Sequence, residues 1–167
     1  MTDMLSFVDL RVMEALNAKP DKGLENALKQ GYREDDGLVL ESDTDEQLLI
    51  HLTFNQSVRL SGLVIKSSAG GQAPKIVKLF VNQPTIGFSE ATESPGVDSF
   101  DLTEAQLTGE VVPLRLVKFN RVNCLTIFVE SNQGDEDTTI IQKIAIQGSA
   151  GETFDVKDFK DVSKQDD

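Results

Sequence analysis

Carboxylates are the most abundant reactive side chains in this sequence, and one stretch places three of them at alternate positions. In "LESDTDEQLL" these acids are Glu41, Asp43 and Asp45. An extended backbone projects alternate side chains to one side, and converging carboxylate oxygens are ligands that calcium takes. The stretch lacks the glycine and the terminal glutamate of an EF-hand loop, and a charged run entering a strand is usually a solvated face. We therefore assign no metal and keep calcium as an alternative.

A second acidic stretch lies in "VESNQGDEDTTIIQKIAIQG", where Asp135, Glu136 and Asp137 are consecutive. Consecutive side chains do not all face one point, and Gly134 indicates a turn. Paired carboxylates for glycoside hydrolysis need a fixed separation across a cleft, which sequence does not define. We interpret the three acids as a turn that keeps one end of a sheet soluble or meets a basic partner.

Other catalytic side chains are scarce. His51 is the only histidine and Cys124 the only cysteine, so a zinc site lacks ligands and an internal disulfide lacks a second thiol. We expect His51 to face solvent from the middle of a strand and Cys124 to be packed. The catalytic arrangement that stays open is a triad built from residues far apart in the sequence. Gly70-Gly71 lacks the spacing of a phosphate-binding loop and reads as a turn. We therefore expect no enzyme activity and no cofactor.

The charge balance narrows the class of partner. The formal net charge is -12, and the 16 basic residues are scattered among 28 acids. Such a surface repels nucleic acid and anionic membranes, favours a protein partner with basic patches, and disfavours self-association, so we expect a monomer. The sequence shows neither a basic leader with an apolar core nor about 20 consecutive apolar residues. We expect an intracellular chain.

Two helices are expected near the N-terminus. One is predicted over residues 2–19, because apolar residues recur every three to four positions and Pro20 forbids continuation. The recurring residues are Leu5, Val8, Val12 and Leu16. A second, short helix is predicted over 22–30, with Gly31 as its stop.

After Gly37 the apolar period changes to two. Strands are predicted over 48–54, 58–65, 75–82, 111–119, 121–130 and 138–148, with an irregular segment over 83–109. The alternation slips by one residue at Ser61-Gly62, which is typical of a β-bulge. Short β-branched runs with no helices between them predict an all-β fold, an antiparallel sandwich or jelly roll. Phe154, Val156 and Phe159 predict partial docking of the polar tail.

Several long stretches resemble the PITH domain family, named for proteasome-interacting thioredoxin-like proteins. They are "LESDTDEQLLIHLTFNQSVRLSGLVIK", "GGQAPKIVKLFVNQPTIGFSEATE", "VPLRLVKFNRVNCLTIFVESNQGDEDTTIIQKIAIQG", "FKDV" and the opening "MEALNAKPDKGLENALK". The resemblance implies a jelly-roll β-sandwich similar to galactose-binding domains. It also implies a non-catalytic module that associates with the regulatory particle of the 26S proteasome in cytosol and nucleus.

We expect a single PITH domain over 1–167. It comprises a helical or irregular segment over 1–36, the sandwich over 37–150 and a partly ordered acidic tail over 151–167. The best known members place a thioredoxin domain before this one, and we expect a stand-alone member without it. We therefore do not expect the redox activity of those members in this chain.

The resemblance implies no catalytic residues, but three loop stretches carry over as candidates for partner binding. They are Glu41-Ser42-Asp43, Asn82-Gln83-Pro84 and Ser131-Asn132-Gln133-Gly134, to which we add Asp45, Asp135, Glu136 and Asp137. Asn82 and Asn132 are more often residues that tie a turn to the backbone. The alternative is a polar recognition rim made by all three loops. The rival function is a ligand-binding sandwich whose end cleft holds a carbohydrate or calcium.

Overall fold

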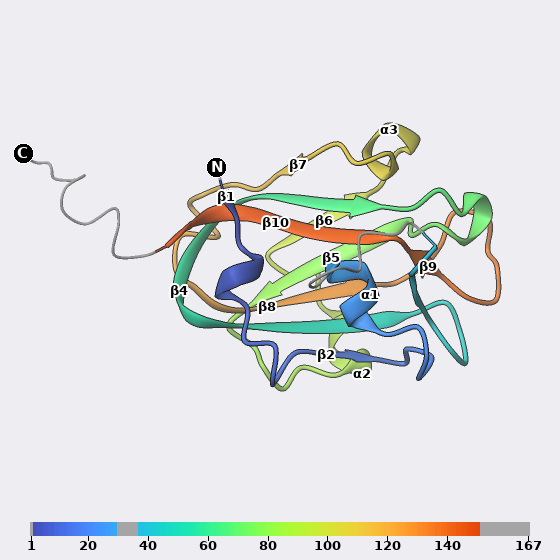
Figure 1. The fold of residues 1–167 in the computed structure, drawn as a ribbon, viewed down its shortest axis with the longest axis horizontal. Helices are drawn as coiled ribbons and strands as arrows, with labels where there is room; N and C mark the ends of the chain where they lie inside the picture. Colours follow the sequence, from blue (N-terminus) through green and yellow to red (C-terminus); the bar gives the residue numbers. More distant parts are fainter. Residues whose placement is uncertain (1, 30–36, 151–167) are drawn as a thin grey trace, which may run out of the picture.

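One long strand, β4 (Leu48–Lys66), belongs to both layers of the structure. The computed structural model describes residues 2–29 and 37–150. The first half of β4 pairs with β8 and β2, and the second half pairs with β10 and β7. Every pairing is antiparallel, and β4 curls from one sheet into the other (Figure 1). The predicted antiparallel β-sandwich is confirmed.

The remaining elements extend these two layers, cover their faces or form a separate two-stranded sheet. The elements before β4 are β1 (Thr2–Asp3), η1 (Leu5–Phe7), β2 (Glu14–Leu16), α1 (Leu24–Leu28) and β3 (Leu40–Glu41). Those that follow are η2 (Gly70–Gln72), β5 (Ile76–Val81), α2 (Phe88–Glu93), β6 (Asp98–Asp101), α3 (Glu104–Leu107), β7 (Val112–Pro113), β8 (Val122–Val129), β9 (Ile140–Ile141) and β10 (Lys143–Ala150). One layer has the order β2-β4-β8-β5-β6, and the other has β1-β10-β4-β7. None of the helices in the described part of the chain has the length or hydropathy that crossing a membrane requires.

The corner of β4 contains the predicted bulge. Gly62 pairs with Gln147 and Leu60 pairs with Gly148, so Ser61 has no opposite residue on β10. This extra residue bends the strand and increases its twist. A second break, over residues 54–57 against β8, completes the turn and was not predicted.

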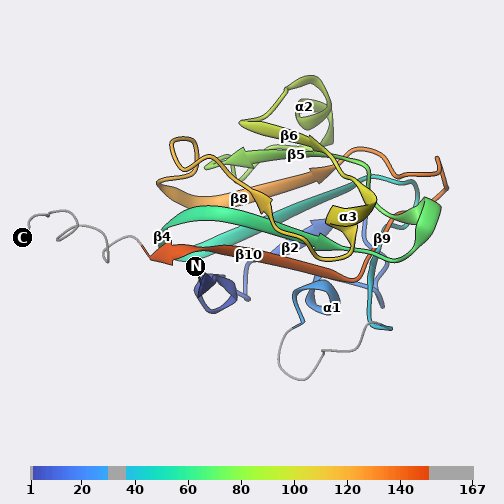
Figure 2. The ribbon, with the colours of Figure 1, turned by 90° about the horizontal axis from the view of Figure 1, so that it is seen from above.

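The main core lies between the layers. Leu48, Ile50 and Leu52 of β4 are buried against the inward side chains of β8, including Ile127 and Val129. A second buried cluster lies on the outer face of the β4-β8-β5 layer and consists of Leu49, Phe80, Ile86, Ala91 and Phe128. Helix α2 covers this outer face, whereas α1 lies on the opposite side of the sandwich (Figure 2).

The helix predicted over 2–19 is wrong. Its residues form one short turn, η1, and two short strands, and Val12 is 53% exposed. The edge of β4 explains the difference, because its backbone groups pair with β2 and with the N–H of Asp9, which donates to the carbonyl of Thr53. A short segment with helical apolar spacing is not stable as an isolated helix, so it does not compete with this strand pairing.

Other predicted elements hold in part. The helix predicted over 22–30 is confirmed as α1, which ends at Lys29 in the left-handed conformation. Strands 75–82 and 121–130 are confirmed as β5 and β8. Only Val112–Pro113 of the strand predicted over 111–119 is extended, and the segment predicted as irregular contains α2, β6 and α3. The prediction for the tail lies outside the described residues.

Gly148→Ala is expected to destabilise the fold by about 2–3 kcal/mol, because overpacking against fixed atoms has this magnitude. A Cβ atom at this position would overlap the carbonyl oxygen of Arg59 beside the bulge. Urea unfolding followed by circular dichroism measures the change. The control Ser149→Ala, on the same strand, should change the free energy of unfolding by no more than about 0.5 kcal/mol. Equal effects of the two variants would contradict the close approach of Gly148 to the backbone of Arg59.

Candidate functional site

The two acidic stretches meet at one end of the sandwich. Strand β3 pairs with β9, with Glu41 opposite Ile140. Glu41 and Ser42 also bond Thr138 and Thr139, which directly follow the second acidic stretch. Figure 1 shows β3, β9 and η2 gathered at the end away from the corner of β4. The structure therefore unites two of the three predicted loop stretches.

Glu41 points into this end of the protein. Its carboxylate accepts a hydrogen bond from the Thr138 hydroxyl at 2.7 Å and forms ion pairs with Lys19 and Lys22, both at 3.1 Å. Burial alone would raise the pKa of this carboxyl group, but the bonds from Thr138, Lys19 and Lys22 outweigh it and lower the pKa. Glu41 is therefore a buried anion that ties three segments together.

Ser42 and Asn132 continue this buried polar network. The Ser42 hydroxyl accepts from the N–H of Thr139 at 2.8 Å, and the Thr139 hydroxyl donates to the carbonyl of Glu46 at 2.7 Å. The Asn132 amide donates to the carbonyls of Glu136 and Thr138, both at 3.1 Å, and its oxygen accepts from the N–H of Glu136 at 2.8 Å. These bonds fix the backbone of the acidic turn.

Asp45 is held by Asn17, a residue that the sequence analysis missed. The Asn17 amide donates to the Asp45 carboxylate at 2.8 Å and to the carbonyl of Gln47 at 2.7 Å. Asn17 has a φ of 70°, a left-handed conformation that asparagine adopts more readily than most residues. Its only sequence signal is an asparagine three residues before Pro20.

Five of the predicted acids at this end are exposed: Asp43, Asp45, Asp135, Glu136 and Asp137. Asp45 is bonded by Asn17, and we call the other four the acidic rim. After β3 and a β-bridge at Ser42, the backbone bends over residues 43–46, so Asp43 and Asp45 do not continue the strand that would place the three acids on one side. In the described part of the chain, no group of three or more His, Cys, Asp or Glu side chains is placed to hold a metal ion. The rim is thus a charged surface on a rigid support.

Asn82 and Gln83 lie at the opposite end. Val81 pairs with Leu125 at the start of β8, whereas the acidic turn follows the end of β8. The Asn82 side chain accepts from the N–H of Asn123 at 2.8 Å and donates to the carbonyl of Arg121 at 3.1 Å. The three loop stretches therefore do not form one rim.

The expectation that His51 faces solvent is wrong. His51 is 7% exposed, and its Nδ1 shares a hydrogen bond of 2.9 Å with the Thr126 hydroxyl. The cause is distant in sequence, because β4 lies between β2 and β8 at this position, with Glu14 and Thr126 opposite His51. Cys124 is buried as expected, and burial raises the pKa of its thiol, partly offset by the backbone N–H groups of Asn82 and Gln83.

A hollow of about 440 Å³ opens beside the acidic turn. Its described lining consists of Ser67, Ser68, Gly70, Ala73, Glu104, Leu107, Thr108 and Gln133, with no aromatic ring. The Gln133 amide already donates to the carbonyls of Pro74 and Leu102, and the Ser67 hydroxyl to that of Ile140. Few polar groups are left to orient a ligand.

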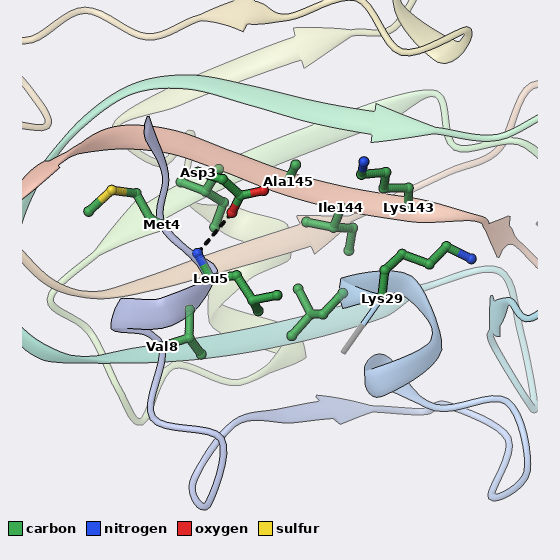
Figure 3. Close-up of a pocket in the computed structure, with 10 residues that line it drawn as sticks. Asp3, Met4, Leu5, Val8, Lys29, Lys143, Ile144 and Ala145 are labelled. Carbon is green, nitrogen blue, oxygen red and sulfur yellow. Dashed lines mark hydrogen bonds between the residues drawn. The ribbon is translucent and has the colours of Figure 1, made fainter. Parts of the chain in front are cut away.

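A smaller pocket lies between η1, α1 and β10 (Figure 3). Leu5, Val8 and Ile144 contribute apolar side chains, and Lys29 and Lys143 flank them. Its volume is about 60 Å³, room for roughly two water molecules at about 30 Å³ each. This space is too small for a sugar ring.

The sequence is similar to a known protein family. The model of the PITH domain matches residues 1–165. The chain belongs to the PITH domain family. Thioredoxin-like protein 1 of Schizosaccharomyces pombe is 36% identical over 81% of the chain, and a PITH domain-containing protein of Caenorhabditis elegans is 31% identical over 91%. The chain spans 47% of the first relative and 73% of the second. The PITH domain-containing relatives are not named as enzymes.

The fold of this PITH domain is also that of carbohydrate-binding modules. A fucose-binding module of Streptococcus pneumoniae superimposes with a TM-score of 0.56 at 11% identity, over 88% of this chain and 98% of the module. CBM32-3 from a family 31 glycoside hydrolase of Clostridium perfringens gives 0.56 at 16% identity, over 86% and 96%. The galactose-binding-like jelly roll is confirmed, and at these identities the likeness shows the fold alone.

Glu41→Gln is expected to lower the free energy of unfolding by about 1–2 kcal/mol at pH 7, because hydrogen bonds to a charged group are lost. The lowered pKa means that ionised Glu41 stabilises the fold above its ordinary value of 4.5, and that this contribution is lost as the pH falls through the folded-state pKa. The difference between wild type and variant should therefore shrink below pH 4.5. Urea unfolding from pH 7 to pH 3 measures it.

Glu93→Gln is the matched control, since Glu93 is exposed and forms no ion pair with any described residue. It should leave stability unchanged across the same range. A Glu41→Gln effect that is the same at pH 7 and pH 3 would contradict the ion-pair assignment.

Cys124 is expected to react with iodoacetamide about tenfold or more slowly in the folded protein than in denaturant, because a buried thiol with a raised pKa forms little thiolate. Mass spectrometry of timed samples at pH 7.5 measures the rate. Equal rates in both conditions would show an accessible thiol and reopen a nucleophilic role for Cys124.

Proposed function

We propose that this PITH domain is a non-catalytic protein-interaction module that associates with the regulatory particle of the 26S proteasome, in cytosol and nucleus. Membership of the family supports the proposal, because the resemblance implies this partner. The observation that carries it is the acidic rim, since an exposed set of carboxylates on a fixed backbone suits recognition of a basic protein surface.

The support beneath the rim matters for binding. The Asn132 side chain holds the turn through hydrogen bonds to the backbone of Glu136 and Thr138, and Asp135 keeps a left-handed φ of 56°. A loop that is already ordered loses less conformational entropy when it binds. The rim also concentrates the negative potential of a chain with net charge -12, which speeds encounter with a basic partner.

The alternative, binding of a carbohydrate or calcium, draws on the likeness to carbohydrate-binding modules and on the hollow beside the rim. The hollow has no aromatic ring among its described lining residues, and stacking on rings is a frequent means of holding a flat apolar face. Glu41, the innermost acid of the calcium hypothesis, is bound to two lysines. Calorimetry with calcium and with fucose, galactose and their disaccharides should give no binding heat, and a saturable signal would restore this alternative.

Neutralising the rim with Asp43→Asn, Asp135→Asn and Asp137→Asn together is expected to weaken binding to purified 26S proteasome by about three- to tenfold at low salt, mainly through kon. Asparagine suits position 135 because it tolerates the left-handed backbone. The difference should vanish near 1 M salt, where the screening length is about 3 Å. Biolayer interferometry with the immobilised domain measures both rates.

The control variant changes the same net charge elsewhere, through Glu14→Gln, Glu93→Gln and Glu110→Gln, all at exposed positions. It should bind like wild type. Equal weakening by both variants would mean that net charge acts instead of the rim. A wild-type domain that does not bind the proteasome at low or moderate salt would contradict the proposed function.

A further inference from the structure

The end of the sandwich opposite the acidic rim has the reverse chemistry. Residues 111–129 contain no acid, in a chain with 28 acids, and they carry Arg115, Lys118 and Arg121. The three cations fall in the loop between β7 and β8, which lies at the corner of β4 in both views (Figures 1 and 2). A local cationic surface thus stands on a strongly anionic protein.

The same loop exposes apolar side chains. Val117 is 79% exposed and Leu116 is 42% exposed, whereas their neighbours Leu114 and Phe119 are 6% and 0% exposed. Val117 is the most exposed of the large apolar residues described in the structure. Single exposed apolar residues are common on protein surfaces, so exposure alone does not distinguish these two from others.

The loop is a rigid turn built on the bulge of β4. The N–H of Leu114 donates to the carbonyl of Ser61, the unpaired residue of the bulge, and the N–H of Leu60 donates to the carbonyl of Phe119, both at 2.9 Å. Inside the turn the N–H of Lys118 donates to the carbonyl of Arg115 at 2.9 Å. Both ends of the turn are anchored at the corner of β4, and the bond inside it closes the tip.

The cations frame this tip. The ammonium group of Lys118 donates to the carbonyl of Val97 at 3.1 Å, and the guanidinium of Arg115 lies 3.9 Å from the carboxylate of Asp98. Arg121 is exposed, and its side chain forms no ion pair with the described residues. The two cations on either side of Leu116 and Val117 in sequence therefore contact residues 97 and 98, and the guanidinium of Arg121 is left to pair with an anion.

We propose that this apolar-basic turn, residues 114–121, is a second docking surface that binds an acidic segment of a protein partner through an apolar side chain flanked by carboxylates. The proposal rests on the proposed function and adds the surface and the chemistry of the contact. The apolar side chain of the partner covers Leu116 and Val117, and its carboxylates pair with Arg121 and Lys118. Preorganised apolar contact supplies affinity, and the charges supply orientation.

Two other occupants fit less well. An anionic bilayer meets a whole face of the protein, and a net charge of -12 opposes that approach, whereas a peptide segment reaches the turn alone. A second copy of the chain would offer the acidic rim, but Asp43, Asp135, Glu136 and Asp137 bring no apolar side chain to cover Val117.

The test is the double variant Leu116→Ser/Val117→Ser, with Val12→Ser as the matched control at an exposed apolar residue far along the chain. The double variant should keep the circular dichroism and unfolding midpoint of wild type. It should weaken binding to purified 26S proteasome about tenfold or more, which is the scale of a central interface contact, while the control stays within about twofold. A photo-crosslinking residue at position 117 should label partner segments that contain Asp or Glu beside an apolar residue.

The outcomes separate the two proposals. A wild-type domain without proteasome binding overturns the proposed function and this inference with it. Wild-type binding that the double variant retains overturns the inference alone, as do crosslinks to segments without acids. Sedimentation with phosphatidylserine vesicles, lost in the double variant, would make a membrane the occupant. Concentration-dependent mass in light scattering, lost in the double variant, would make it a second copy.

Discussion

The continuity of β4 is the constraint on which the rest of the structure depends. A sandwich needs two sheets whose apolar faces meet, and here one backbone of 19 residues supplies a central strand to each. The strand must therefore turn a corner without leaving its hydrogen bonds unmade. Ser61 provides the extra residue, Gly148 allows the close crossing of β10, and the carbonyl of Ser61 finds a partner in Leu114. The turn at 114–119 is thus as much a part of the corner as β4 itself.

The other end of the sandwich is held by polar groups where apolar packing runs out. A buried polar group lowers the stability of the fold when its hydrogen-bond partner is missing. A network in which every group is paired favours one arrangement of the chain. Glu41 joins β3 to the N-terminal segment through Lys19 and Lys22, and to the last loop through Thr138. The acids that remain outside this network face water on a backbone that the network fixes. Buried hydrogen-bonded groups and exposed charges are therefore divided between neighbouring residues of the same loops.

How much of the fold and of the site could be predicted from the sequence depends on how far apart in the chain the contacting residues lie. The alternation in β4 and its slip at Gly62 are local signals, and they gave both the strand and its bulge. The capping box of α3, in which Thr103 and Gln106 bond each other's N–H groups, is equally local, yet it lies in a segment whose weak strand pattern obscures it. The hydrogen bond of buried His51 is made with Thr126, 75 residues along the chain, and the role of Glu41 depends on two lysines about 20 residues away. No local pattern contains such contacts, which is why the N-terminal segment was predicted as a helix and why one rim made by all three loops was left open as an alternative.

The opposite chemistry of the two ends has a geometric consequence. Strand β8 runs from one end to the other, and its eight residues span about 26 Å at about 3.3 Å per residue. Its neighbours on both sides are hydrogen-bonded along much of that length, so the distance changes little under load. Two bodies that touch the two ends are kept apart by at least this distance and in a fixed relative orientation. In an assembly whose parts move, the domain would set the distance between two bound bodies as well as attach to them.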